Sequence, residues 1–581
     1  MTAMKSTRGL IVSSAVALTL AAGMSIGALP GAISPAHALD YTDVQKGFAP
    51  PSTVLTVGSP ESVGLNSEPI DAAKAQIESY MKAATPDGHP LYPGAVGIMG
   101  HDGKIVARET GGYASLYANA TDKLPESQRV PMRDDTIFDL ASVSKLFTSL
   151  VAVQLIEEDK LDLDAPVAQY LPEFAANGKQ DVTVRMLLTH TSGFTSWLPL
   201  WSKYPDKDAR IKAVMDAPLA NPAGSKYLYS DLNLITLGVI VEKLRGAPLD
   251  QVVSERISQP LGMVDTGYNP TAKQRTAATE FQVTPNRGMV WGEVHDENAW
   301  SLGGVAGHAG VFSTADDLAK LSQALLNGGI YQGKRILSKD SVGLLIKNFN
   351  EKFPGDDHGL GFELNQRWYS AGLAGDREAG HTGYTGTSIV LDFDSRSFAI
   401  LLTNRVHPSR DWGSVNPPRR DWAQGLAKAM PVNPTRGPDA WATGDKDKTT
   451  ATLDLPVEPK ADARLNFDLF VDTESTDPFV LEASHDGGKT FAPVPFTLRD
   501  ADKTAAADGK LAVSGLRRWV KADAKLAPGK QVVRFRNTTD NTELGRGIYV
   551  DRVRVDGPGL HFDGEKTPEA FVANGWREAT Y

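Results

Sequence analysis

The sequence of 581 residues contains no cysteine. This absence excludes disulfides, a thiol nucleophile, zinc–thiolate and iron–sulfur sites, and a lipid-modified N-terminal cysteine. It is compatible with secretion, because a chain of this length can bury enough core without cross-links. No run rich in Lys and Arg stands out, and the net charge is −10. The sequence therefore lacks the electrostatic features of a nucleic-acid-binding protein.

Long hydrophobic runs are equally scarce, and the one candidate lies at the N-terminus. Lys5 and Arg8 precede an apolar stretch over residues 9–29, and Ala36-His37-Ala38 matches a small-x-small cleavage pattern. We predict a signal peptide over residues 1–38 and a secreted, extracellular or cell-wall-associated mature chain without a stable membrane span. The alternative is a retained N-terminal anchor. No later segment approaches the ~20 apolar residues that a spanning helix needs.

The pattern of helices and hairpins predicts the first folded region. Residues 39–65 are rich in Pro, Ser and Gly and predict an extended lead-in. Within residues 66–430, two apolar hairpins are expected, over residues 94–107 and 388–403, and segments before, between and after them have helical periodicity. We expect helices at 68–83, 142–158, 182–188, 231–245, 315–326 and 412–429. This order predicts an α+β domain, an antiparallel sheet flanked by helices.

The composition changes after residue 430. Residues 431–448 carry several Pro and Gly followed by a Lys/Asp run, which predicts a linker. Over residues 449–581 the helical periodicity disappears, and short alternating segments are separated by turns such as Asp486-Gly487-Gly488. This spacing is typical of an all-β sandwich domain.

The strongest chemical motif is Ser142-Val143-Ser144-Lys145. Positions i and i+3 of a helix share one face, so the Ser142 hydroxyl and the Lys145 amine can meet. The Ser142 amide at a helix N-terminus is free to donate to an oxyanion. A buried Lys beside cationic or phenolic groups can have a lowered pKa and accept a proton. Alone, the tetrad is a weak signal, because Ser and Lys are common and a solvated helix face has the same pattern.

Two further motifs carry weaker signals. Tyr229 precedes Ser230 and Asp231, and its phenolate can act as a base if positive charge lies nearby. The alternative is a Tyr in a turn, with Asp231 as a helix N-cap. The stretch His381-Thr382-Gly383-Tyr384 lies just before a predicted strand, where glycine lets backbone approach a substrate. In a functional role, His381 is expected to orient the substrate or to adjust the reactivity of Tyr229; alternatively, it makes a structural hydrogen bond.

The order and spacing of these three motifs resemble the serine β-lactamase and penicillin-binding protein superfamily. Residues 60–430 are most similar to its class C β-lactamase-like branch, which includes D-aminopeptidases, esterases and cell-wall amidases. The segments 160–166, 184–194 and 307–315 add to the resemblance. It implies an acyl-enzyme on Ser142 and an oxyanion hole formed by the amides of Ser142 and Tyr384. Lys145 and Tyr229 share general acid and base duties, and which accepts the first proton stays open.

The resemblance also assigns the surrounding residues and shows two departures. Thr382, Gly383, His381 and Asp231 are expected to contact the substrate. Asp231 occupies a position where many relatives have Asn, and His381 replaces the Lys that binds the β-lactam carboxylate. A neutral His holds that anion less firmly, so both departures disfavour a dedicated β-lactamase.

Two histidine-containing stretches suggest a substrate class. Residues 295–299 and 303–308 resemble the branch that contains exo-acting muramyl-peptide amidases, which places His295 and His308 as candidates for the cleft lining. The sequence has no His-Glu-x-x-His and no His pair with ligand spacing, so we expect no metal and no cofactor. A Gly-x-Ser-x-Gly elbow is absent too, which argues against an α/β-hydrolase esterase.

The sequence therefore predicts a secreted serine hydrolase that cleaves an amide or peptide bond in cell-wall-derived muramyl or D-amino-acid peptides. The alternatives are a carboxylesterase or weak β-lactamase with the same site, and a catalytically silent cell-wall binding protein. Residues 484–491 and 545–555 resemble jelly-roll modules appended to secreted bacterial hydrolases. Such modules often bind carbohydrate, so cell-wall glycan is an expected partner; the alternative is a stabilising or spacing domain.

Overall fold

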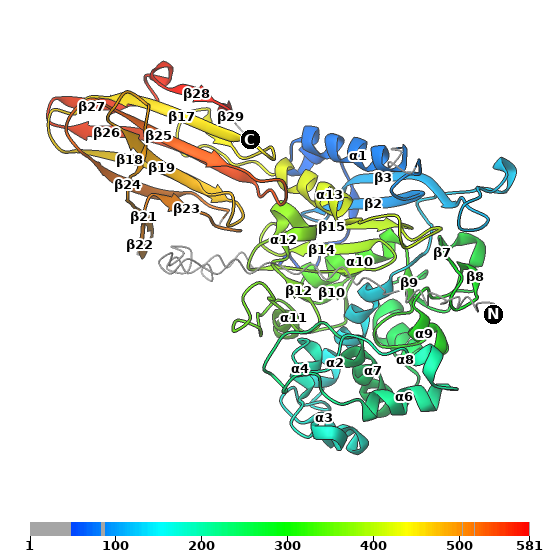
Figure 1. The fold of residues 1–581 in the computed structure, drawn as a ribbon. Coiled ribbons are helices and arrows are strands. Elements are labelled where there is room, and N and C mark those ends of the chain that lie inside the picture. The colour runs from blue at the N-terminus through cyan, green and yellow to red at the C-terminus, as the bar shows by residue number, and fades with distance from the viewer. Residues whose placement is uncertain (1–47, 83–87, 502, 516, 580–581) are drawn as a thin grey trace, which may run out of the picture.

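The computed structural model describes residues 48–581 except 83–87, 502, 516 and 580–581 (Figure 1). The predicted signal peptide and the start of the predicted lead-in lie outside the described residues. Within the described part of the chain, no helix has the length and apolar character needed to cross a membrane.

The first region is built on one eight-stranded sheet in the order β1-β3-β2-β15-β14-β13-β12, with β4 paired to β3. All neighbours pair antiparallel except β1 and β3. The two predicted hairpins therefore meet at the centre of the sheet, where β15 pairs with β2. The strands are β1 (Thr56–Val57), β2 (Gly94–His101), β3 (Lys104–Ser115), β4 (Val130–Pro131), β12 (Glu363–Leu364), β13 (Glu378–Gly383), β14 (Thr387–Asp392) and β15 (Ser397–Thr403).

Helices cover both faces of this sheet because alternate strand residues are apolar on each side. On one face, α1 (Ser67–Lys82) and α13 (Asn416–Ala429) bury side chains such as Ile77 and Trp422 against Met99. On the other face, α10 (Ala315–Leu326) packs with residues of the larger core. The helix expected from residue 412 begins at Asn416, where the two prolines that follow fit a first helical turn.

A helical subdomain lies below the sheet in the view of Figure 1. Its centre is α2 (Ser144–Glu157), in which every residue from Ser144 to Leu155 is buried, and α7 (Asp231–Arg245) packs beside it. The remaining helices of the region are α3 (Val167–Tyr170), α4 (Val184–Leu188), α5 (Leu200–Lys203), α6 (Lys207–Asp216), α8 (Leu249–Val253), α9 (Glu297–Ser301), α11 (Lys339–Leu345) and α12 (Arg367–Ser370). Small sheets join β5 (Phe138–Asp139), β9 (Val311–Ser313) and β6 (Gly267–Tyr268); β7 (Ala278–Gln282) and β8 (Gly288–Trp291); and β10 (Ile330–Tyr331) and β11 (Lys334–Arg335).

The C-terminal region is all β and consists of two sheets that share one apolar core. The first has the order β22-β21-β24-β18-β26-β16-β29 with β27 on β26, and the second β20-β19-β25-β17-β28 with β23 on β19. The longer strands are β17 (Thr450–Val457), β18 (Ala463–Asp472), β19 (Phe479–Ser484), β24 (Val520–Leu526), β25 (Gln531–Thr538) and β26 (Gly547–Gly557). The shorter ones are β16 (Ala440–Thr443), β20 (Ala492–Pro493), β21 (Phe496–Asp500), β22 (Lys503–Ala507), β23 (Lys510–Leu511), β27 (Leu560–Asp563), β28 (Val572–Asn574) and β29 (Arg577–Ala579). The predicted fold class, an α+β region followed by a β-sandwich, is confirmed.

The segment 431–448, predicted to be a linker, is partly folded into the sandwich. Within residues 431–448, strand β16 pairs with β26 and β29, so the sandwich begins before residue 449. The Pro- and Gly-rich composition masked the alternating residues Ala440 and Ala442, which are buried. A buried ion pair also joins the regions: Arg367 of α12 lies 2.7 Å from Asp472 at the end of β18.

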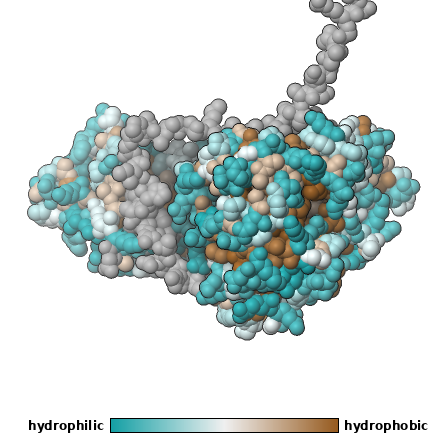
Figure 2. Space-filling view, turned by 90° about the horizontal axis from the view of Figure 1, so that it is seen from below, coloured by the Kyte–Doolittle hydropathy of each residue, from teal (hydrophilic) through white to brown (hydrophobic). Residues whose placement is uncertain are grey.

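Figure 2 shows that hydrophilic residues dominate the lower face of both regions, with apolar residues gathered on the larger one.

Candidate active site

Ser142 lies in a 3-10 turn over Ala141–Val143 that runs directly into α2. The sequence pattern predicted Ser142 and Lys145 on one continuous helix; instead, a tighter turn precedes the helix. Ala141 has a φ of 47°, a left-handed conformation that costs a non-glycine residue about 1–2 kcal/mol. The Asp139 carboxylate accepts a hydrogen bond from the Ala141 amide at 2.8 Å. This contact stabilises the sharp bend just before Ser142.

Lys145 is 1% exposed and lies at the centre of the site. Its Nζ donates to Ser142 Oγ at 3.0 Å and to the His308 carbonyl at 3.1 Å. It also forms an ion pair with Asp231 Oδ1 at 2.8 Å. Burial favours the neutral amine, but the charges of Asp231 and Tyr229 outweigh it and raise the pKa of Lys145 above its ordinary value. The lowered pKa predicted for Lys145 from the sequence is therefore wrong, because the ion pair with Asp231 was not part of that prediction.

Tyr229 precedes α7, and its phenol is close enough to Lys145 and Ser142 that both act to lower its pKa. Its ring lies 4.8 Å from Lys145 Nζ. Burial raises the pKa of Tyr229 to about 12, although Lys145 acts in the opposite direction. The N-cap of α7 is Ser230, whose hydroxyl accepts from the Leu232 amide, and Asp231 belongs to the first turn. The alternative with Asp231 as N-cap is therefore wrong, and its carboxylate is available to Lys145.

His190 supports Tyr229 from behind. Its Nδ1 accepts a hydrogen bond from the Ser230 amide at 3.1 Å, and its ring lies 4.6 Å from the Tyr229 ring. Burial lowers the pKa of His190 well below its ordinary value, which keeps that nitrogen an acceptor. His190 therefore positions the turn that carries Tyr229.

The turn between β13 and β14 docks onto the residues that precede Ser142. Thr385 Oγ1 donates to the Asp139 carbonyl at 2.7 Å, and Thr387 Oγ1 donates to the Leu140 carbonyl at 3.0 Å. A Cβ on Gly383 would lie 2.3 Å from the Leu140 carbonyl oxygen, so only glycine permits this approach. Among the described residues, the amides of Ser142 and Tyr384 have no hydrogen-bond acceptor.

His381 is buried on β13, and its ring centre lies 6.0 Å from that of Tyr229. Its Nδ1 donates to the Thr382 carbonyl at 2.8 Å, while Nε2 has no partner within the described chain. Burial, aided by the charge of Lys145, lowers the pKa of His381 to about 3. The side chain is therefore a neutral imidazole at physiological pH, with Nε2 as an acceptor.

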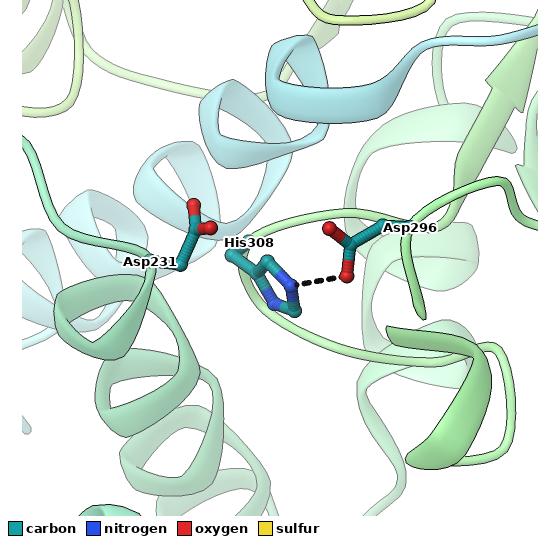
Figure 3. Close-up of side chains that lie close together, drawn as sticks. All are labelled: Asp231, Asp296 and His308. Atoms are coloured by element: carbon teal, nitrogen blue, oxygen red, sulfur yellow. Dashed lines mark hydrogen bonds and ion pairs between the residues drawn. The ribbon is translucent and has the colours of Figure 1, made fainter. Parts of the chain in front are cut away.

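The side chains of Asp231, Asp296 and His308 lie close together (Figure 3), and Asp231 is the ion-pair partner of Lys145. One candidate ligand atom from each lies within 4.8 Å of the others, which is compatible with a cation site. However, His308 Nε2 is engaged with Asp296 Oδ1 at 2.9 Å, and the Lys145 ammonium already contacts Asp231. The three side chains fit an ion-pair network in which Lys145 supplies the positive charge.

The Beta-lactamase family profile matches residues 78–424, more than half of the chain. This chain belongs to the beta-lactamase family. An Escherichia coli (strain K12) protein named "Putative D-alanyl-D-alanine carboxypeptidase" is 34% identical over 391 residues, which cover 61% of this chain and 86% of that protein. A Salmonella agona (strain SL483) protein of the same name is 32% identical and covers 64% of this chain and 90% of its own length.

Among solved structures, a penicillin-binding protein homolog from Caulobacter crescentus is similar at 22% identity, with a TM-score of 0.48; the match covers 62% of this chain and 98% of that one. The predicted superfamily is confirmed, and the chain is a serine hydrolase of the β-lactamase and penicillin-binding protein family.

The beta-lactamase-family site opens into a hollow of about 720 Å³ lined by Ser142, Tyr229, His381, Thr382, Gly383 and Tyr384. His295 and His308 do not line it; they are 3% and 1% exposed and lie behind its wall. His295 pairs with Glu280 at 2.9 Å and stacks beneath Tyr384 at a ring distance of 5.8 Å. Their expected place in the cleft lining is therefore corrected to a supporting one.

The three motifs gave no indication of the charged residues that also line the hollow, Glu363, Arg405, Arg410, Asp411 and Arg419. Arg405 and Arg410 lie on a loop after β15, and Arg419 lies in α13. No short motif connects these positions, because they meet Ser142 only through the order of strands in the sheet. A cluster of arginines close after the last hairpin was the only available signal.

Proposed function

We propose that this chain is a secreted hydrolase that forms an acyl-enzyme on Ser142 and cleaves an amide or peptide bond in cell-wall-derived muramyl or D-amino-acid peptides. One observation carries the proposal: Ser142 Oγ lies 3.0 Å from Lys145 Nζ, and the Tyr229 ring lies 4.8 Å from the same Nζ. An alcohol, an amine and a phenol in mutual contact provide an activated nucleophile. The name of the Escherichia coli relative supports a peptide substrate.

The proposed reaction begins with Tyr229, because Asp231 holds Lys145 in its charged form. The Tyr229 phenolate, stabilised by the Lys145 ammonium, accepts the Ser142 proton as Oγ attacks the substrate carbonyl. The amides of Ser142 and Tyr384 stabilise the oxyanion. The phenol then returns the proton to the leaving amine, and water hydrolyses the ester on Ser142 by the reverse sequence of proton transfers.

The test is intact-mass analysis after treatment with a fluorophosphonate, combined with hydrolysis of an N-acetylmuramyl-alanine peptide. The wild type and the control variant Ser202→Ala, an exposed serine on α5, are expected to gain one adduct and cleave the peptide. Ser142→Ala is expected to gain none and to lose turnover, with stability within about 0.5 kcal/mol of the wild type. An adduct or turnover in folded Ser142→Ala would contradict the assignment.

A carboxylesterase is the second candidate. Neutral His381 lacks the charge that holds a β-lactam carboxylate in many relatives, which favours acyl donors other than β-lactams. Parallel assays with p-nitrophenyl butyrate and nitrocefin separate the possibilities. Faster turnover of the ester than of every muramyl or D-amino-acid peptide would favour the esterase, and absence of all turnover and adducts would favour a silent binding protein.

We further propose that the sandwich binds cell-wall glycan. A hollow of about 280 Å³ brings Trp441 and Phe571 together with the carboxylates of Glu565 and Glu578. An aromatic face beside hydrogen-bond acceptors suits a sugar ring, which has an apolar face and peripheral hydroxyls. Trp441→Ala is expected to lose cosedimentation with insoluble peptidoglycan, whereas Trp300→Ala in the first region is expected to retain it. Equal retention by both variants would contradict glycan binding at this hollow.

A further inference from the structure

Three arginines face the hollow that contains Ser142, and two of them are engaged within the protein. Arg410 is held by the carboxylates of Glu280 and Glu297. Arg419 is 6% exposed and donates to the carbonyls of Gly383 and Thr387 at 2.7 and 3.0 Å. Both therefore stabilise the wall of the hollow and its strand, with little capacity left for a ligand.

Arg405 is different. Among the described residues no carboxylate lies within 4.0 Å of its guanidinium; Nη2 donates to the Gly413 carbonyl. The side chain is half-buried, and burial lowers the pKa of Arg405, although a guanidinium stays protonated in proteins. It offers five N–H donors in a planar fork, of which a single backbone carbonyl uses only a part.

The backbone places Arg405 against the turn that carries Tyr384. Gly386 in that turn has a φ of 109°, and a Cβ there would lie 2.7 Å from the Cβ of Arg405. The close approach is thus possible because residue 386 is glycine. Arg405 is also near enough to Tyr384 to lower the pKa of its phenol, against the larger effect of burial. The guanidinium therefore lies on the Tyr384 side of the hollow.

From this arrangement we infer that Arg405 binds a carboxylate of the substrate. The inference rests on the proposed hydrolase function and narrows it to substrates that carry a free carboxylate. His381 is neutral and cannot supply the countercharge, whereas Arg405 is charged, accessible from the hollow and without a carboxylate partner. A guanidinium and a carboxylate can form two parallel charge-assisted hydrogen bonds, which bind and orient the substrate together.

The experiment compares substrates that differ only in this charge. One pair is a peptide ending in D-alanine as the free acid and as the amide; the other is the mono-p-nitrophenyl esters of glutaric acid and glutaramic acid. We expect the wild type to prefer the acid of at least one pair through a lower KM. In Arg405→Gln, this acid-to-amide preference in kcat/KM is expected to fall about 10- to 100-fold, because hydrogen bonds to charged groups contribute strongly.

Arg335→Gln is the matched control, since Arg335 is an exposed arginine on β11 away from the hollow, and it is expected to keep the preference. A preference that Arg405→Gln leaves unchanged, or a wild type that treats acid and amide alike in both pairs, would overturn the role of Arg405. Failure of the hydrolase proposal looks different, because no substrate is then cleaved and no fluorophosphonate adduct forms. Binding of the acid and amide peptides to Ser142→Ala, measured by calorimetry, tests Arg405 independently of turnover.

Discussion

The ion pair between Asp231 and Lys145 makes a quantitative prediction for Asp231→Asn. The two groups are 2.8 Å apart, and Lys145 is 1% exposed. At an effective dielectric constant of about 20, opposite charges at about 4 Å interact by about 4 kcal/mol. One pH unit corresponds to about 1.4 kcal/mol, so removal of this charge is expected to ease deprotonation of Lys145 by about three pH units. Burial, which remains in the variant, acts in the same direction.

The sign of the effect on activity follows from the protonation states. In the wild type, Lys145 and Tyr229 both keep their protons at neutral pH, so the rate should rise with pH through the neutral range without a plateau. In Asp231→Asn, the Lys145 amine becomes neutral at lower pH and can accept the Ser142 proton. The rise of kcat/KM with pH in Asp231→Asn should therefore occur about three pH units lower than the corresponding rise in the wild type.

The assay is hydrolysis of p-nitrophenyl butyrate between pH 5 and 10. Asp208→Asn is the control, because Asp208 is likewise an acid in the first turn of a helix but lies on the exposed α6. The control shows whether the loss of one first-turn carboxylate elsewhere in the chain changes the pH profile. Coincident pH profiles for the wild type and folded Asp231→Asn would refute the claim that Asp231 sets the protonation state of Lys145.

Three further predictions concern stability and metal dependence. Burial lowers the pKa of His407 to about 4, so below pH ~6.5 the unfolded chain binds a proton at this residue that the folded chain does not bind. The free energy of unfolding of the wild type should therefore fall by about 2 kcal/mol between pH 7 and 5 because of His407 alone. Urea titrations of His407→Gln should lack that part of the decrease. Asp472→Asn should destabilise the chain by about 3 kcal/mol, since Arg367 is left buried without its partner; an unchanged urea midpoint would contradict this. EDTA should leave turnover unchanged, because Lys145 occupies the position of a cation beside Asp231, and a loss restored by a divalent ion would show otherwise.

Local patterns in the sequence were sufficient for most of the fold. The helix expected at residues 315–326 is α10, and the hydroxyl of Thr314 caps it by accepting a hydrogen bond from the Asp317 amide. The spacing of Ser142 and Lys145 likewise predicted their contact. The strained Ala141 could not be predicted, because its conformation depends on hydrogen bonds to Asp139 that form only once β5 is in place.

The electrostatics of the site were less accessible, since they arise between residues far apart in the chain. Asp231 follows Lys145 by dozens of residues, so its effect on the Lys145 pKa required the packing of α7 against α2. For the same reason the guanidinium of Arg405 was not connected with Ser142. Sequence patterns predict the conformation of a single helix or strand, whereas the pKa of a group depends on every charge that the fold brings close to it.

The two departures from the β-lactamase pattern have a common electrostatic consequence. Asp at position 231 adds one negative charge beside Lys145, and neutral His at position 381 removes one positive charge from the opposite side. Relative to a site with Asn and Lys at these positions, the immediate surroundings of Ser142 are more negative by two charges. Such a site repels a carboxylate at the position where many relatives hold it. A substrate anion then needs another cation of the hollow, the role we propose for Arg405, so the carboxylate site and the raised pKa of Lys145 are both linked to this pair of substitutions.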